Sequence, residues 1–125
     1  MTNIIKQGDT WPYLEFAFVD EDNLPVDCTG YEVQLLVRDR KKTTVIDATV
    51  GSVLDEETAA GAIWIDQTLG TGEYHWSPAD TLKQGKFEYE FKFTRLSDGK
   101  VFTLPQQGFL EYEVTEDIPL DDINY

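Results

Sequence analysis

The most regular pattern in the chain is the alternation of aromatic and charged residues over residues 86–94. Every second position there is aromatic, namely Phe87, Tyr89, Phe91 and Phe93. Consecutive side chains of a strand point to opposite faces, whereas a helix would scatter these aromatics around its axis. The segment therefore predicts a strand in an antiparallel sheet, with one apolar face and one face in solvent.

The same period of two recurs in seven other segments rich in β-branched and aromatic residues, as a half-buried pleated surface favours. They are residues 13–19, 31–38, 43–50, 62–66, 73–77, 100–104 and 109–115. Clusters of turn-forming residues lie between them at 20–23, 70–72 and 97–99, and Asp98-Gly99 favours a tight hairpin. About seven or eight short strands with regular turns predict an all-β fold, an antiparallel β-sandwich.

Helical signals are confined to two short segments. Residues 55–60 have the composition of a single helical turn, and Ser77 followed by Pro78 is a common way to enter a helix. The 125 residues, 41% of them hydrophobic and 13% aromatic, suit one packed domain and differ from acidic disordered chains. We assign residues 1–118 to a single β-sandwich domain and residues 119–125 to an acidic C-terminal tail.

Charge excludes several classes of partner. The chain has 10 Lys and Arg against 24 Asp and Glu, which gives a formal net charge of −14. Nucleic acids are bound mainly through Lys and Arg that neutralise phosphates, and the one basic cluster, residues 38–42, is flanked by acidic residues as in a solvated turn. We therefore expect no nucleic acid and no membrane among the partners.

The cysteine content and the first residues bear on the cellular compartment. Cys28 is the single cysteine, so no intramolecular disulfide can form. Residues 1–9 lack the apolar run of a signal peptide, and no segment is long and apolar enough to span a bilayer. These features predict synthesis in a reducing cytosol or assembly into a larger structure.

Candidate catalytic and metal-binding residues are few. His75, the only histidine, lies between Tyr74 and Trp76 in a strand pattern, which favours a structural position on a sheet face. Cys28 follows an apparent turn and is interpreted as a small buried apolar residue. We therefore expect no catalytic residue, no cofactor and no enzymatic activity.

Acidic residues suggest two further sites, neither with a specific motif. Asp20, Asp22 and Asn23 are clustered oxygen ligands of the kind that calcium prefers, but the spacing of an EF-hand is absent. Glu88 and Glu90 lie on one strand face between lysines, as in an exposed charge ladder and not a glycosidase pair. We assign no metal ligand, and a calcium-stabilised adhesin-type domain stays as a weaker alternative.

Two tryptophans are candidates for an interface. Trp64 alternates with Ile63 and Ile65, which predict that the opposite face is the buried one, although a core position for Trp64 is equally compatible. Trp11 precedes Pro12 and suits either an interface or a lid over the core. Exposed tryptophans bind protein partners or stack on sugars. A carbohydrate-binding β-sandwich module that uses these aromatics is therefore the alternative function.

A series of short motifs follows in a fixed order between residues 4 and 115. They are Gln7–Thr10, Asp20, Pro25–Asp27, Thr29-Gly30, Ala79–Thr81, Gly85–Phe87, Glu90-Phe91, Ser97–Gly99, Thr103–Pro105, Gly108-Phe109 and Val114. In order and spacing the series resembles the N-terminal domain of phage baseplate upper proteins, which are tail-tip components of phages and prophages of Gram-positive bacteria. Cys28 departs from the pattern, because this family tends to have a larger apolar residue there.

The resemblance implies an immunoglobulin-like antiparallel β-sandwich without catalysis. Such a domain docks into a baseplate and positions receptor-binding components, so the implied partners are other phage tail or baseplate proteins, including a second copy of the chain. The implied location is the tail of the virion, after assembly in the cytoplasm of the bacterial host. An acidic surface fits this role, because it keeps the free subunit soluble and steers it towards a basic partner.

Overall fold

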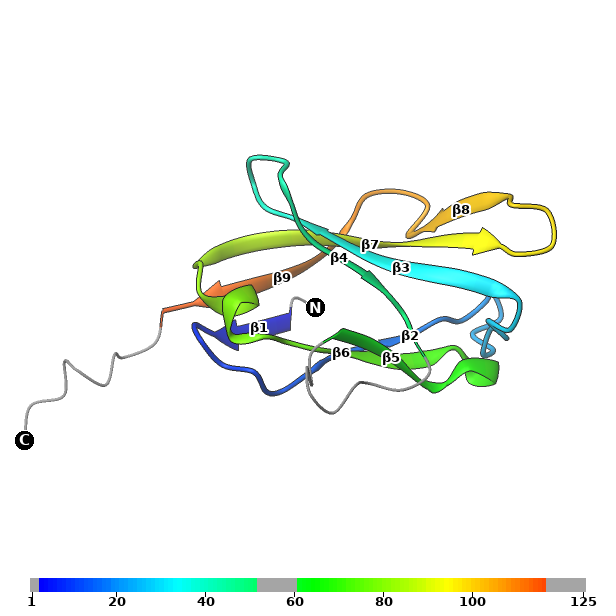
Figure 1. Ribbon diagram of the computed structural model, residues 1–125, viewed down its shortest axis with the longest axis horizontal. Helices are drawn as coiled ribbons and strands as arrows, with labels where there is room; N and C mark the ends of the chain where they lie inside the picture. Colours follow the sequence, from blue (N-terminus) through cyan, green and yellow to red (C-terminus); the bar gives the residue numbers. More distant parts are fainter. Residues whose placement is uncertain (1–2, 52–60, 117–125) are drawn as a thin grey trace, which may run out of the picture.

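The computed structural model describes residues 3–51 and 61–116, and it consists of two β-sheets that face one another (Figure 1). The larger sheet contains β1 (Asn3–Lys6), β3 (Tyr31–Arg38), β4 (Thr44–Thr49), β7 (Gly85–Arg95), β8 (Val101–Leu104) and β9 (Leu110–Thr115). The smaller sheet contains β2 (Leu14–Ala17), β5 (Gly61–Asp66) and β6 (Thr71–His75). The all-β, sandwich-like prediction is confirmed at this level.

The strand order is β1-β9-β7-β3-β4 in the larger sheet and β2-β6-β5 in the smaller one. The paired strands are antiparallel except β1 and β9, which run parallel, so the larger sheet is mixed and the prediction of a wholly antiparallel sandwich is corrected. The sequence did not predict β1, because Asn3-Ile4-Ile5-Lys6 does not alternate. Its pairing with β9 joins residues more than a hundred positions apart, which local pattern does not reveal.

Strand β7 is the central strand of the larger sheet. It pairs with β3 on one side, and on the other side with β9 along its first half and with β8 along its second half. Its four aromatics are all buried at 6% exposure or less. The predicted alternation is therefore confirmed over this strand, and these rings form one wall of the core.

The inner face of the smaller sheet supplies the opposite wall. Its buried residues belong to the same core cluster as the aromatics of β7 and Tyr112 of β9. They are Leu14 and Phe18 from the β2 segment, Trp64 from β5, and Tyr74 and Trp76 from the β6 segment. Phe18 packs edge-on to Phe91 and Phe93, with ring centroids 4.9 and 4.8 Å apart. Residues from both sheets thus share a single aromatic core.

The turns match the sequence in part. Ser77 precedes a short 3₁₀ helix, η2 (Pro78–Thr81), and the β7–β8 hairpin closes at Ser97–Gly99, both as predicted. In the predicted turn 70–72 only Gly70 is a turn residue, following the 3₁₀ helix η1 (Gln67–Leu69), because Thr71 and Gly72 already belong to β6. The proposed helical turn at 55–60 and the acidic tail 119–125 lie outside the described residues.

Candidate interaction surface

The two candidate tryptophans differ in exposure. Trp11 lies in the loop between β1 and β2 and is 70% exposed, so it is not a lid over the core. Trp64 is only 9% exposed and belongs to the core cluster. The expectation of an exposed Trp64 is therefore wrong, and of the two interpretations only the core position agrees with the structure.

The physical reason lies in the competition between the two faces of β5. Ile63 and Ile65 are apolar, as is Trp64, so alternation alone does not decide which face turns inward. Trp64 buries the larger surface and packs edge-on against Phe16 and Phe18, with ring centroids 6.1 Å away in each case. The register shifts between Trp64 and Asp66, which leaves Ile65 on the outside at 61% exposure.

His75 lies on the outer face of β6, as predicted, in a structural cluster. Its Nε2 lies 2.6 Å from Glu73 Oε1, and its ring stacks on Tyr13 with centroids 3.7 Å apart. The side chains of His75 and Glu73 are 16% and 19% exposed. The stack of Tyr13 on His75, together with the contact between His75 and Glu73, holds the segment before β2 against β6.

Cys28 is fully buried, as predicted. Its Sγ is 3.6 Å from the Val26 carbonyl oxygen, to which the thiol donates. Burial, with the nearby Asp27 charge as a lesser cause, raises the pKa of the thiol to about 11. The thiol is therefore protonated at neutral pH, the form that is a poor nucleophile.

The acidic loop at Asp20 uses its carboxylate to hold its own backbone. Asp20 Oδ1 accepts hydrogen bonds from the amides of Asp22 and Leu24 at 2.9 and 3.0 Å. Among residues 3–51 and 61–116, no group of three or more His, Cys, Asp or Glu residues is arranged to hold a metal ion. The structure thus gives the loop a local role as a turn.

Glu88 belongs to a charged network on the outer face of the larger sheet. Its Oε1 lies 3.1 Å from Lys42 Nζ and 3.3 Å from Arg38 Nε. The hydrogen bond from Lys42, helped by both positive charges, lowers the pKa of Glu88. Of the predicted charge ladder, only Glu88 forms ion pairs among the described residues, and its cations come from β3 and the following turn, not from the flanking Lys86. Glu88 and Glu90 are both half-buried, so the prediction of an exposed ladder is corrected.

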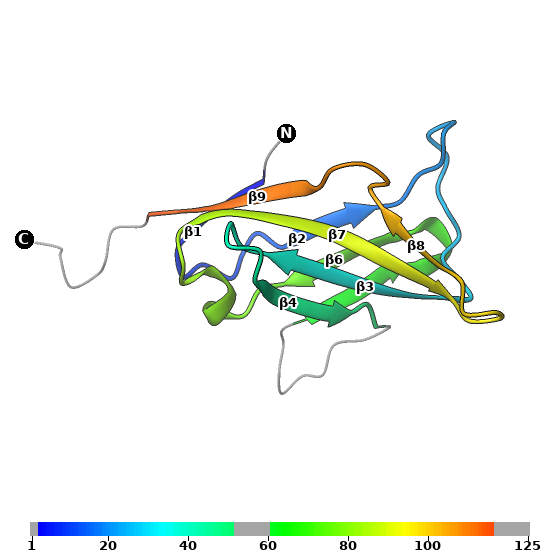
Figure 2. The ribbon, with the colours of Figure 1, turned by 90° about the horizontal axis from the view of Figure 1, so that it is seen from above.

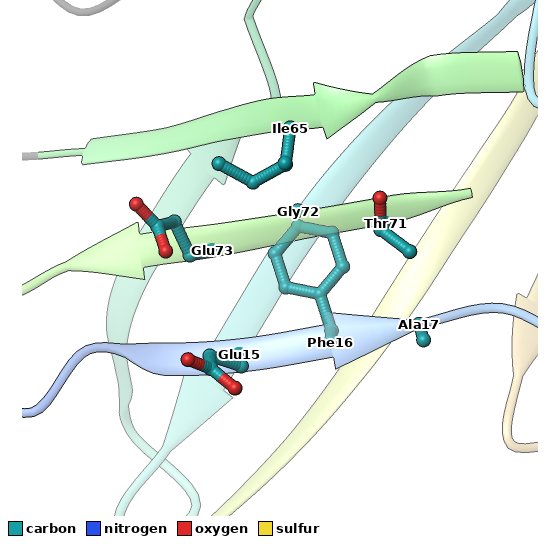
Figure 3. A pocket seen from close by; sticks show the side chains of 7 residues that line it. All are labelled: Glu15, Phe16, Ala17, Ile65, Thr71, Gly72 and Glu73. Carbon is teal, nitrogen blue, oxygen red and sulfur yellow. The ribbon is translucent and has the colours of Figure 1, made fainter. Parts of the chain in front are cut away.

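A shallow hollow of about 460 Å³ lies on the outer face of the smaller sheet. Figure 3 shows its lining, with Glu15 on β2 beside Glu73 on β6 and Ile65 across from them on β5. Glu15 and Glu73 are direct cross-strand partners in the β2–β6 register. Two carboxylates opposite one another repel, so the hollow favours cationic groups.

A second hollow, of about 320 Å³, opens between the two sheets on the other side of β2. Its walls are largely apolar and include Phe16, Tyr89, Phe91, Leu104 and Leu110. Glu15, Phe16 and Ala17 line both hollows, so β2 forms a ridge between them. We call this ridge with its two hollows the β2 edge. No motif in the sequence marks it, so it could not be predicted from the residues alone.

Comparison with known proteins assigns the chain to no family. No protein-family model matches the chain, and no curated protein matches it significantly. Within the described part of the chain, no helix is long and apolar enough to cross a membrane.

Proposed function

We propose that this protein is a non-enzymatic structural component of a phage or prophage tail or baseplate. It docks by protein–protein contacts and positions receptor-binding components, and its place is the virion tail after assembly in the host cytoplasm. The observation that carries the proposal is the ordered series of motifs between Gln7 and Val114. The all-β sandwich supports it, since a rigid sandwich with exposed edges and faces suits a docking module.

We further infer that the sandwich is immunoglobulin-like. The variable-type immunoglobulin sandwich has strands in the order G-F-C-C′ in one sheet and B, E and D neighbouring in the other. The orders β9-β7-β3-β4 and β2-β6-β5 support the same arrangement. A departure is that the single cysteine excludes the intersheet disulfide of antibody domains.

Mass spectrometry of purified virions tests the tail assignment. The bacterial strain that encodes the chain is induced, and particles are purified by density gradient. We expect the chain in the particles in a fixed ratio to known tail proteins, and its gene among tail genes. Particles that lack it, together with a gene remote from any phage gene, would refute the proposal.

The carbohydrate-binding alternative now depends on Trp11 alone. This side chain is 70% exposed, as a sugar-stacking platform requires, but burial of Trp64 removes the second aromatic of the proposed platform. A glycan array decides the matter. Binding that Trp11→Ala abolishes would favour this alternative, whereas an array without binding would remove it.

A further inference from the structure

The β2 edge has backbone groups that no described strand uses. Strand β2 pairs with β6 and with no other strand of the described chain. The Phe18 amide donates to the Gly70 carbonyl at 2.9 Å, on the β6 side. Since backbone groups of a strand alternate between its two sides, those of Glu15 and Ala17 point away from β6. In an immunoglobulin sandwich this is the side on which strand A pairs with strand B, whereas β1 pairs with β9 here.

On the face of the sheet that turns towards the core, the β2 edge is apolar and open. Strands β8 and β9 pair with successive parts of β7, and the chain between Leu104 and Leu110 leaves the sheet. Figure 2 shows β2 on the same side of the sandwich as β8 and β9. The hollow of about 320 Å³ lies in this gap, and two of its lining residues, Val19 and Leu110, are 49% and 43% exposed.

On the solvent face of the sheet, the β2 edge is acidic. Glu15 is exposed and forms no ion pair with any described residue, while its partner Glu73 contacts His75. A strand added beside β2 would therefore place one set of alternate side chains in the apolar hollow. It would place the other set beside Glu15.

We propose that the β2 edge accepts an extended segment of another tail protein, in which apolar residues alternate with Lys or Arg. This rests on the proposed docking function and specifies its mode as strand addition, in which main-chain hydrogen bonds give affinity and alternate side chains give specificity. The basic positions face Glu15, and the apolar positions fill the hollow between the sheets.

Charge favours such a partner over the other occupants. A second copy carries the same net charge of −14 and would bring further carboxylates to Glu15 and Glu73. The chain's own residues 117–125 contain Asp117, Asp121 and Asp122 and no basic residue. Like charges close together disfavour both.

The other edge of the smaller sheet, at β5, is less suitable. The outer side of β5 is partly occupied by Gly51, which donates to the Ala62 carbonyl at 2.9 Å and accepts from the Trp64 amide at 2.8 Å. Strand β2, at the opposite edge of this sheet, is flanked by a hollow on each side.

The test uses two synthetic peptides of identical composition, one of alternating Lys and Val and one with the same residues in two blocks. Both are titrated into the full chain, and binding is followed by fluorescence anisotropy and by amide shifts in NMR spectra. We expect the alternating peptide to bind more tightly and to shift the amides of Glu15 and Ala17. Equal binding of both peptides, no binding, or shifts confined to the larger sheet would overturn the proposal.

Variants of the chain sharpen the test. Glu15→Lys is expected to weaken binding of the alternating peptide about tenfold, because the attraction between residue 15 and the lysines of the peptide becomes repulsion. Glu32→Lys, the same charge change at an exposed position of β3, is the matched control and should change the affinity by less than about twofold. Equal effects of the two variants would show that net charge, and not the β2 edge, governs binding.

Ala17→Pro removes the backbone amide of residue 17, which points away from β6. Proline is tolerated in a sheet at edge positions of this kind. We expect it to abolish binding while the melting temperature stays close to that of the parent chain. If this variant does not fold, Leu110→Ser, which places a hydroxyl in the apolar hollow, should weaken binding instead. Unchanged binding by a folded variant would contradict strand addition.

Two outcomes separate this inference from the proposed function. If the chain is present in virions but the peptides do not bind, the tail role stands and strand addition is wrong. If the alternating peptide binds at β2 but virions lack the chain, the edge is a docking site in another setting. A dimer in sedimentation experiments that Ala17→Pro dissociates would identify a second copy as the occupant and overturn the proposal.

Discussion

Two tyrosines of the core differ in the hydrogen bonding of their hydroxyl groups. Tyr74 donates to Asp80 Oδ2 at 2.7 Å, and the same carboxylate oxygen accepts the Ser77 amide at 2.8 Å, so the bond secures the start of η2. The Tyr112 hydroxyl is buried and has no hydrogen-bond partner among the described residues. Burial is the main cause that raises the pKa of both phenols, so both are neutral at physiological pH.

Tyr112→Phe and Tyr74→Phe form a matched pair. A hydrogen bond to a charged group contributes about 1.5–3 kcal/mol, and an unsatisfied buried hydroxyl costs about 1–3 kcal/mol. We expect Tyr74→Phe to lower the free energy of unfolding by about 2 kcal/mol and Tyr112→Phe to leave it unchanged or raise it. Urea denaturation measures both. A loss for Tyr112→Phe as large as that for Tyr74→Phe would contradict this assignment.

Cys28 provides a reporter of the folded state. Because it is fully buried and its thiol pKa is raised to about 11, the reactive thiolate is scarce and shielded near neutral pH. We expect a thiol reagent at mildly alkaline pH to label the folded chain at least about a hundredfold more slowly than the chain in urea. Comparable labelling rates in both conditions would show that Cys28 is accessible in the native state.

At the scale of elements, close contact between β2 and β6 depends on a glycine. A Cβ atom at Gly72 would lie 2.5 Å from Phe16 Cζ and 2.6 Å from the Ile63 carbonyl oxygen. The Phe16 ring thus lies across Gly72, where a side chain would otherwise be, as Figure 3 shows. This contact explains why a residue typical of turns is found inside a strand.

Gly72→Ala is expected to destabilise the β2–β6 pair. Overpacking of this kind costs about 1–3 kcal/mol, because backbone atoms of β5 must move. Gly51→Ala is the control, since among the described residues a Cβ there would meet only the Ala62 carbonyl oxygen, at 4.0 Å. Thermal and urea denaturation compare the two variants. Equal stability of Gly72→Ala and the parent chain would contradict the close packing.

The turn between β3 and β4 is organised by Asp39. Its Oδ1 accepts the amides of Lys41 and Thr43 at 2.9 and 3.0 Å, and its Oδ2 lies 3.4 Å from Lys83 Nζ. The backbone hydrogen bond from Thr43 is the largest cause that holds the pKa of Asp39 below its ordinary value of 3.8, with Lys83 contributing. A pKa lower in the folded than in the unfolded chain stabilises the fold above the unfolded value, and this stabilisation is lost as the pH falls through the folded value.

Asp39→Ala should therefore lower the free energy of unfolding at pH 7, and its difference from the parent chain should shrink below a pH of about 3.8. The exposed loop residue Asp22, replaced by Ala, serves as a control for loss of one negative charge. Urea denaturation across the pH range gives both curves. A difference for Asp39→Ala that grows on acidification would contradict the assigned sign.

At the scale of the whole molecule, repulsion among carboxylates dominates the electrostatics. The described chain contains five ion pairs, and one of them involves His75. Of the described carboxylates, four form ion pairs, those of Asp39, Glu73, Glu88 and Asp98. The chain has 24 acidic residues against 10 Lys and Arg. This excess keeps copies apart and lowers the stability of the compact state.

Moderate salt is therefore expected to stabilise the isolated chain at neutral pH. The Debye length shortens from about 30 Å at 0.01 M to about 10 Å at 0.1 M, which screens this repulsion. We expect the melting temperature to rise by a few degrees over this range, and less near pH 4, at about the ordinary pKa of carboxyl groups. Salt should also weaken binding of the basic peptide. Binding that strengthens with salt would contradict an electrostatic contribution from Glu15.

Local pattern was sufficient for the strands with one apolar face. Alternation in β3 and β7 predicted both the strands and their buried positions, and Asp98-Gly99 predicted the hairpin between β7 and β8, because these signals depend on neighbouring residues alone. Charge and the single cysteine likewise follow from the sequence. The alternation and the turn signals together predict an all-β sandwich.

Tertiary structure decided what depends on contacts between distant residues. In β5 both faces are apolar, and only packing against Phe16 and Phe18 turned Trp64 inward. The parallel pairing of β1 with β9 and the glycine inside β6 also require partners far away in the sequence. The β2 edge exists because β8 and β9 divide the length of β7 between them and leave β2 uncovered beside the gap. No periodicity encodes such a gap, since it arises from how the two sheets meet in space.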